Sequence, residues 1–144
     1  MKMNKCSVCS WIISKTRDRR EIFEKDDIIA VLDESPKARG HTLVILKDHT
    51  ADNSSVLPIL EAAMERPLVR IATAIKQALG AEFVCRASIG DLVGHVQYHL
   101  IPRYGKDPKG FVHFMSSRGK LSDEPDAGLE IAGKIRATLR LIKS

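Results

Sequence analysis

Short segments in which apolar and polar residues alternate occur in both halves of the chain and predict β-strands. A period of two places every second side chain on a core, which is the pattern of a half-buried strand. Residues 41–47 contain four consecutive apolar residues, too many for strict alternation, so we expect a central strand that is buried on both faces. The other predicted strands cover residues 22–24, 28–33, 82–88 and 95–103, and the first two are joined by a hairpin turn at 25–27.

A longer segment repeats apolar residues every three or four positions, which is the period of an amphipathic helix. This helix is expected to begin near Val56, with an N-cap among residues 52–55 and with Pro58 tolerated in its first turn. Pro67 is expected to kink or restart the helix, because proline lacks a backbone N–H. Gly80 is expected to end it.

A second helix is expected from Ser122 onward, with its apolar face formed by Ile131, Ile135, Leu139 and Ile142. The order of strands, long helix, strands and final helix indicates an α+β protein with a largely antiparallel sheet. The length of 144 residues is that of a single domain, which we expect to span residues 1–144.

Composition and charge narrow the class of protein. Hydrophobic residues make up 44% of the chain and charged residues 28%, which is ordinary for a soluble globular protein. No apolar run approaches the roughly 20 residues that a membrane helix needs, and the first residues lack the apolar segment of a signal peptide. We therefore expect a cytoplasmic protein with no membrane partner. The formal net charge of +5 favours anionic ligands such as nucleotides, although a basic solvated surface would give the same charge.

The candidate functional residues are densest in the predicted strand at 95–103. Successive side chains of a strand point to opposite faces, so His95, Gln97 and His99 are expected to share one face. The intervening apolar residues are expected to point into a core: Val96, Tyr98 and Leu100. A half-exposed strand with incidental polar residues is the alternative interpretation. Histidine occurs only five times in the chain, which makes two in this segment harder to regard as incidental.

Residues 95–103 resemble the signature of the histidine-triad (HIT) family, in which three histidines alternate with apolar residues. Residues 23–49 are similar to the family's N-terminal half, and residues 121–124 to the segment before its last helix. The resemblance implies a HIT-like α+β fold with one long helix and a C-terminal helical extension at about 121–144. It also implies a homodimer in which the long helices and central strands of two copies join into one sheet.

Gln97 stands where the HIT family has its middle histidine, the nucleophile that takes a nucleotidyl group. Glutamine has no titratable nitrogen near neutral pH and is not a useful nucleophile toward phosphorus. His99 occupies the third triad position, and the resemblance implies that it can hold a phosphate oxygen.

Three explanations of Gln97 are open: drift toward a binding or structural role, an engineered His→Gln change that traps ligand, or transfer of the nucleophile's task to His99. Val84, Arg86 and Asp91 also depart from the family pattern, which favours drift, because one engineered change would not account for all of them. A shift of two residues along a strand moves the reacting group by about 7 Å, which disfavours His99 as the nucleophile.

The resemblance further implies a nucleotide site. Asp33 stands at the acidic position that bonds the ribose hydroxyls in the family, and Val8, Ile12 and Val31 stand at positions of the base pocket. Plain core packing is the alternative interpretation of the three apolar residues.

Asp91 occupies the place of a family glutamine that contacts phosphate. A carboxylate there repels a phosphate unless a cation intervenes. Arg86 and Arg103 are the candidate cations.

Cys6 and Cys9 form a Cys-x-x-Cys motif, whose spacing lets two thiolates bind one tetrahedral ion. A redox motif is the competing interpretation, but it usually lies at a helix start in a βαβ unit, which this sequence does not predict. The resemblance supplies two further ligands, His49 and His95, and so implies a closed structural Zn²⁺ site. Cys85 is expected to be a small buried apolar residue.

The sequence therefore predicts a zinc-stabilised protein that binds a purine nucleotide or nucleoside phosphate. By resemblance, the related reaction is hydrolysis or transfer at the α-phosphate of nucleoside phosphoramidates or dinucleoside polyphosphates, and Gln97 is expected to leave little or no turnover. A non-enzymatic homodimeric scaffold is the main alternative. A zinc-finger-like nucleic-acid binder is disfavoured, because the candidate ligands span residues 6 to 95 rather than one compact finger.

Overall fold

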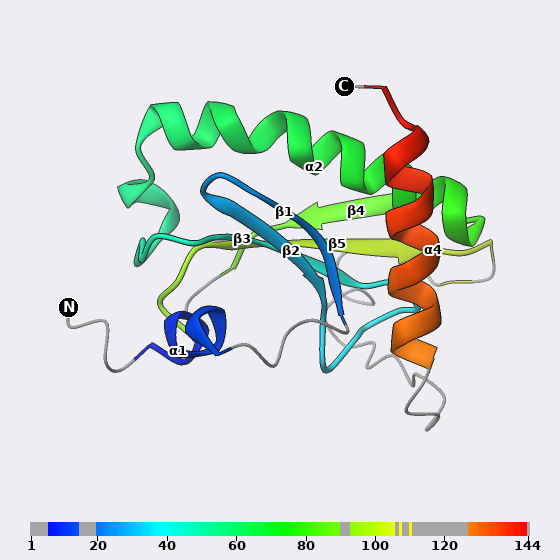
Figure 1. Ribbon diagram of the computed structural model, residues 1–144, viewed down its shortest axis with the longest axis horizontal. Helices are drawn as coiled ribbons and strands as arrows, with labels where there is room; N and C mark the ends of the chain where they lie inside the picture. The colour runs from blue at the N-terminus through cyan, green and yellow to red at the C-terminus, as the bar shows by residue number, and fades with distance from the viewer. Residues whose placement is uncertain are drawn as a thin grey trace.

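The computed structural model describes residues 6–14, 20–89, 93–105, 107, 110 and 127–143. Within these residues, five strands form one antiparallel sheet in the order β1-β2-β3-β5-β4 (Figure 1). The strands are β1 (Glu21–Lys25), β2 (Ile28–Leu32), β3 (Thr42–Leu46), β4 (Phe83–Ala87) and β5 (Gln97–Arg103). The helices are α1 (Ser7–Ile13), the short 3-10 helix η3 (Asn53–Ser55), α2 (Pro58–Leu79) and α4 (Ala127–Leu141). This arrangement confirms the predicted α+β fold with a long helix and a C-terminal helix.

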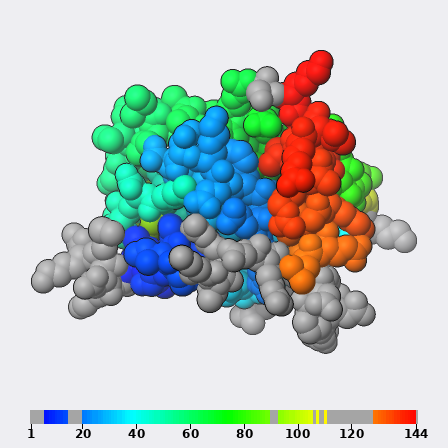
Figure 2. All heavy atoms as spheres, viewed as in Figure 1, coloured from blue at the N-terminus to red at the C-terminus, as the bar shows by residue number. Residues whose placement is uncertain are grey.

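Different helices cover the two faces of the sheet. On one face, Ala30, Val44 and Tyr98 belong to the main core, which α2 and α4 complete. On the other face, α1 packs against a smaller apolar cluster, formed by Ile29, Val31 and Ile45 with Val8, Trp11, Ile12 and Leu43 around them. Figure 2 shows α4 lying alongside β1 and β2. The central strand β3 is buried along most of its length, as predicted for residues 41–47.

The alternation predicted for residues 95–103 is present, but the strand begins two residues later, at Gln97. Val96, Tyr98 and Leu100 belong to the core on the α2 face. Gln97 pairs with Ile45 and His99 with Leu43, which places both polar side chains on the α1 face. His95 instead follows Gly94, which has a left-handed φ of 58°, so the chain turns before the strand starts.

The long helix begins later than the sequence predicts, and it continues through Pro67. Asp52 caps η3 through the Ser54 N–H at 2.8 Å, whereas α2 begins only at Pro58. Proline at the start of a helix loses nothing, since that N–H has no partner within the helix. Pro67 lies inside α2, which runs to Leu79 without a restart. An interior proline costs about 3 kcal/mol, and the burial of one face of α2 offsets that cost: Met64, Leu68, Ile71, Ala74 and Ile75.

Gly80 ends α2 with a φ of 68°, as predicted. In α4, Ile131, Ile135 and Leu139 are buried and Ile142 packs against the same core, which confirms the predicted apolar face. Residues 121–126 of the expected helical extension lie outside the described residues. No helix among the described residues is long and apolar enough to cross a lipid bilayer.

Candidate functional site

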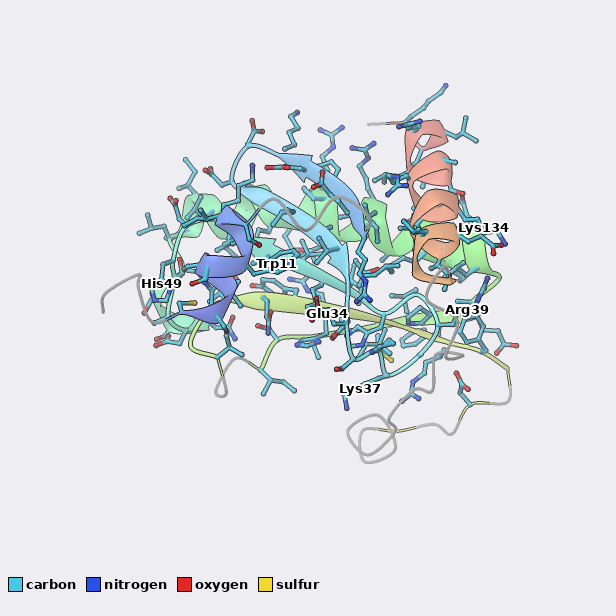
Figure 3. The ribbon with its side chains drawn as sticks, turned by 60° about the horizontal axis from the view of Figure 1, so that its bottom comes forward. Trp11, Glu34, Lys37, Arg39, His49 and Lys134 are labelled. Atoms are coloured by element: carbon cyan, nitrogen blue, oxygen red, sulfur yellow. The ribbon has the colours of Figure 1, made fainter. Side chains whose placement is uncertain are left out.

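Two clusters of candidate functional side chains lie at opposite ends of β3. At one end, His49 follows β3 and His95 precedes β5. At the other end, Asp33 follows β2 and His41 precedes β3. Figure 3 shows His49 beside α1 at the first end, and Lys37 in the loop at the second. The antiparallel pairing of β3 with β2 and β5 brings these residues together, although they are far apart in the sequence.

The first cluster has the geometry of a four-ligand metal site. The donor atoms of Cys6, Cys9, His49 and His95 all lie within 4.8 Å of one another. Nδ1 of His49 is 3.3 Å from Sγ of Cys9, and Nδ1 of His95 is 3.5 Å from each of the two sulfurs. A tetrahedral zinc ion would hold a sulfur and a nitrogen about 3.6 Å apart. The four side chains implied as ligands therefore converge at separations that suit zinc.

The surroundings of the cluster favour metal binding. Nε2 of His95 donates to the carbonyl oxygen of Leu46 at 2.7 Å, which leaves Nδ1 unprotonated and facing the sulfurs. The N–H of Cys9 donates to Sγ of Cys6 at 3.5 Å. Burial, followed by the hydrogen bond with Cys6, raises the pKa of the Cys9 thiol to about 11. A cation is therefore needed for Cys9 to be a thiolate at neutral pH.

The second cluster joins Asp33, His41 and His99. Nε2 of His41 lies 3.0 Å from Nδ1 of His99 and 3.4 Å from Oδ2 of Asp33. The N–H of Lys37 donates to Nδ1 of His41 at 3.0 Å, and the N–H of Ser35 donates to Oδ1 of Asp33 at 2.8 Å. Both nitrogens of His41 and both oxygens of Asp33 thus face neighbouring groups.

Burial keeps both histidines of the second cluster neutral near pH 7. It lowers the pKa of His41 to about 4, because the carboxylate of Asp33 only partly compensates for the lost solvation. Burial also lowers the pKa of His99, although the carboxylate of Asp33 acts to raise it. These rings therefore act through the tautomer they adopt rather than through a positive charge.

Sequence reasoning did not include His41 among the site residues. It is the first residue of the strand predicted at 41–47, where we expected a core position, and its side chain is indeed almost fully buried. The available signal was chemical: a histidine in such a buried place needs polar partners.

The nucleotide-site residues implied by the resemblance lie on the α1 face. Val8, Ile12 and Val31 meet in the smaller apolar cluster, and Asp33 follows directly after β2. Trp11 belongs to the same cluster, and sequence reasoning missed it. Gln97 lies beside this cluster, opposite Ile45 and two residues before His99.

The residues proposed for the phosphate end are mostly elsewhere. Arg86 pairs with Leu100 on the α2 face, where its guanidinium bonds Glu65 at 2.6 and 3.0 Å and lies 4.9 Å from the centre of the Tyr98 ring. Arg86 is therefore engaged by Glu65 on the face opposite to Gln97 and His99. Arg103 ends β5, four residues and roughly 13 Å beyond His99. Asp91 itself lies outside the described residues.

Two further positions change the interpretation of the sequence. Val84 packs against the main core on the α2 face, so it does not share a face with Gln97 and His99. Cys85 is half-buried rather than buried, because β4 is an edge strand with one neighbour in the described sheet. The prediction of a buried Cys85 was wrong for that reason.

Comparison with known proteins identifies the family. The HIT domain model matches residues 14–106. The chain belongs to the HIT-domain family. A HIT-like protein of Mycoplasma genitalium is 34% identical over 131 residues, which cover 86% of this chain and 92% of that protein.

Two solved structures extend this HIT-family relationship to nearly the whole chain. A zinc-bound histidine triad family protein from Mycobacterium smegmatis has a TM-score of 0.78 at 29% identity and covers 97% of this chain and 96% of its own. A hypothetical histidine triad nucleotide-binding protein from Sulfolobus tokodaii has a TM-score of 0.77 at 25% identity and covers 94% of this chain and 93% of its own. These relationships agree with the predicted HIT-like fold.

Proposed function

We propose that this HIT-family protein binds a purine nucleoside phosphate on the α1 face of its sheet, with little or no turnover. The observation that carries the proposal is the shared face of Gln97 and His99 beside the apolar cluster of α1. Asp33 belongs to the same region, since His41 contacts both Asp33 and His99. The purine base would contact the apolar cluster, the ribose hydroxyls would bond Asp33, and the phosphate would lie at Gln97 and His99.

The low turnover follows from the chemistry of Gln97. In the family that the chain resembles, a histidine at this place attacks phosphorus and forms a nucleotidylated intermediate. A carboxamide can donate and accept hydrogen bonds, but it has no free nitrogen lone pair with which to attack. Gln97 and His99 would therefore hold the phosphate without cleaving its bond to a leaving group.

A structural zinc ion at Cys6, Cys9, His49 and His95 is part of the proposal. The zinc-bound relative and the separations of the four donor atoms support it. With four protein ligands the metal would have no open position, so it would link α1 to the ends of β3 and β5 without acting on substrate. That link would hold Val8 and Trp11 in place against the sheet.

Binding can be tested by calorimetric titration of the protein with AMP and GMP. Trp11 is the single tryptophan of the chain and belongs to the apolar cluster, so its fluorescence reports on ligand at this face. We expect binding with a changed Trp11 emission, weakened about tenfold or more in Asp33→Asn through loss of a charged hydrogen-bond acceptor. Lys134→Gln on the exposed side of α4 is the control, which should bind like the parent. Folded protein that binds neither nucleotide at millimolar concentration would contradict the proposal.

A second candidate function is that of a non-enzymatic homodimeric scaffold. The observation that favours it is the exposure of large apolar residues on α2 and on the edge strand β4, including Val69 and Phe83, each 62% exposed. Self-association through this surface would also be compatible with nucleotide binding on the α1 face. The absence of nucleotide binding together with a stable dimer would favour the scaffold as the protein's only function.

A further inference from the structure

The hydrogen bonds of His41 determine which of its nitrogens carries the proton. The backbone N–H of Lys37 donates to Nδ1 of His41 at 3.0 Å, so that nitrogen must be unprotonated. His41 is only 1% exposed, and burial lowers its pKa to about 4, so the ring is neutral at pH 7. A neutral imidazole with an unprotonated Nδ1 carries its single proton on Nε2.

The proton on His41 then determines the tautomer of His99. Nε2 of His41 lies 3.0 Å from Nδ1 of His99, a distance suited to an N–H donor and an unprotonated acceptor. Asp33 lies at the longer distance of 3.4 Å from the same nitrogen and can accept only a weaker share of the bond. With its Nδ1 accepting from His41, a neutral His99 must carry its proton on Nε2.

We propose that the Lys37 backbone N–H and His41 form a relay that fixes His99 as its Nε2–H tautomer, which makes His99 a neutral hydrogen-bond donor to an oxyanion ligand. His41 is thus a positioning residue that acts through His99. The ligand part of this inference rests on the proposed nucleotide site, whereas the tautomer does not and can be measured without a ligand.

The relay gives His99 a role distinct from that of a nucleophile. A histidine nucleophile attacks with an unprotonated nitrogen, and the unprotonated nitrogen of His99 is engaged by His41. The side chain of His99 is partly exposed, so ligand can approach its ring. This arrangement disfavours one of the three explanations of Gln97, namely that His99 has taken over the role of the nucleophile.

The relay also weighs against a second metal ion at this place. The donor atoms of Asp33, His41 and His99 lie within 4.8 Å of one another and would suit a cation by distance alone. The Lys37 N–H requires an unprotonated Nδ1, so the single proton of the His41 ring lies on Nε2. A metal ion at Nε2 would have to displace that proton, which would leave both nitrogens of the ring unprotonated. The hydrogen-bond relay and the metal site are therefore exclusive alternatives.

The tautomer can be measured by long-range ¹H–¹⁵N NMR of protein labelled with ¹⁵N-histidine, since the two ring nitrogens differ strongly in shift between tautomers. We expect the zinc-loaded, nucleotide-free parent to show His41 and His99 with protonated Nε2. Lys37→Pro removes the backbone donor, and we expect it to mix the tautomers of both rings. Lys37→Ala is the matched variant that keeps the N–H, and it should retain the parental tautomers.

A second variant and a ligand titration complete the test. His41→Leu, with folding checked by its amide spectrum, removes the ring N–H that donates to His99. It should release His99 into a tautomer mixture and weaken AMP binding about ten- to a hundredfold through loss of an oriented donor to a charged phosphate. Protonated Nδ1 on His99 in the parent, an unchanged His99 tautomer in folded His41→Leu, or a second equivalent of Zn²⁺ that shifts both rings would each overturn the relay. A confirmed tautomer without AMP binding would refute the nucleotide proposal and leave the relay standing.

Discussion

Nε2 of His95 lies 2.7 Å from the carbonyl oxygen of Leu46, the last residue of β3. This hydrogen bond couples the proposed zinc site to the sheet, because it fixes the His95 ring with Nδ1 toward Cys6 and Cys9. The same bond explains how His95 serves the cluster although it precedes β5 rather than belonging to it.

Replacement of one thiol should remove the metal and destabilise the fold. We expect the parent to bind one zinc per chain and Cys9→Ser to bind none, because three ligands with a neutral hydroxyl hold zinc poorly. The melting temperature should fall by about 10 °C or more, which corresponds to at least about 3 kcal/mol for a chain of this size. Elemental analysis and calorimetry measure the two effects.

Cys85→Ser is the matched control for the thiol prediction, because Cys85 lies on β4 outside the four-residue cluster. It should retain a full equivalent of zinc and lose little stability. Stoichiometric zinc in Cys9→Ser, or loss of zinc in Cys85→Ser, would show that the ligands have been assigned wrongly.

Buried neutral His41 should make the fold sensitive to moderate acid. Its pKa falls from the ordinary 6.5 to about 4 on folding, so above pH 6.5 it is neutral in both states and its contribution to stability is complete. Between pH 6.5 and 4 the unfolded chain takes up a proton that the folded chain refuses, and stability falls by about 1.4 kcal/mol per pH unit. The total loss approaches about 3 kcal/mol and ends below pH 4.

His41→Asn isolates this effect from the protonation of the zinc ligands, which both proteins share. Between pH 7 and pH 5, urea unfolding should show a loss in the parent that exceeds the loss in the variant by about 2 kcal/mol. Equal losses in the two proteins would mean that His41 is protonated in the folded state or is not buried.

The fold was largely predictable because its strands carry strong local patterns. The first four predicted strands agree with the structure to within one residue at each end, and Gly80 ends the helix as expected. Pro67 does not restart the helix, because packing of the apolar face of α2 outweighs the hydrogen bond that proline removes. The start of β5 was misplaced because period-two alternation continues through His95, where a left-handed Gly94 has already turned the chain.

The site was predictable only where residue type and family resemblance acted together. The four implied zinc ligands do lie together: Cys6, Cys9, His49 and His95. The separation in sequence between the two histidines and the thiols would not by itself have predicted that they form one site. His41 was missed because its partner His99 lies 58 residues away, and only the pairing of β3 with β5 brings them together. The face on which Arg86 lies could not be predicted, because it depends on the strand register, which the sequence does not state.

The face assignment of Val84 and Arg86 changes what Gln97→His is expected to do. Two of the four departures from the family pattern, Val84 and Arg86, lie on the other face from Gln97 and His99, where we propose that the phosphate binds. We therefore expect Gln97→His to hydrolyse adenosine 5′-phosphoramidate at least a hundredfold faster than the parent. The rate is measured from the release of AMP, which is monitored by chromatography.

Gln97→Ala is the control for this gain of activity, because it opens the same space without supplying a nucleophile. It should remain as slow as the parent. A Gln97→His variant that binds AMP but does not turn over the phosphoramidate would mean that the catalytic geometry is lost beyond position 97, and Asp91 would be the first residue to examine.

The exposed apolar residues of α2 and β4 should hold two copies of the chain together. Val69 and Phe83 are each 62% exposed, and within the described residues β4 is an edge of the sheet, whose backbone groups can pair with another strand. We expect the parent to sediment as a dimer at micromolar concentration and Val69→Glu to weaken the dimer at least about 30-fold, since a charge would be buried at the interface. Leu141→Glu places the same charge at an exposed apolar residue of α4 and should leave the dimer intact. A monomeric parent would contradict the predicted dimer, and dissociation by Leu141→Glu alone would place the interface on α4 instead.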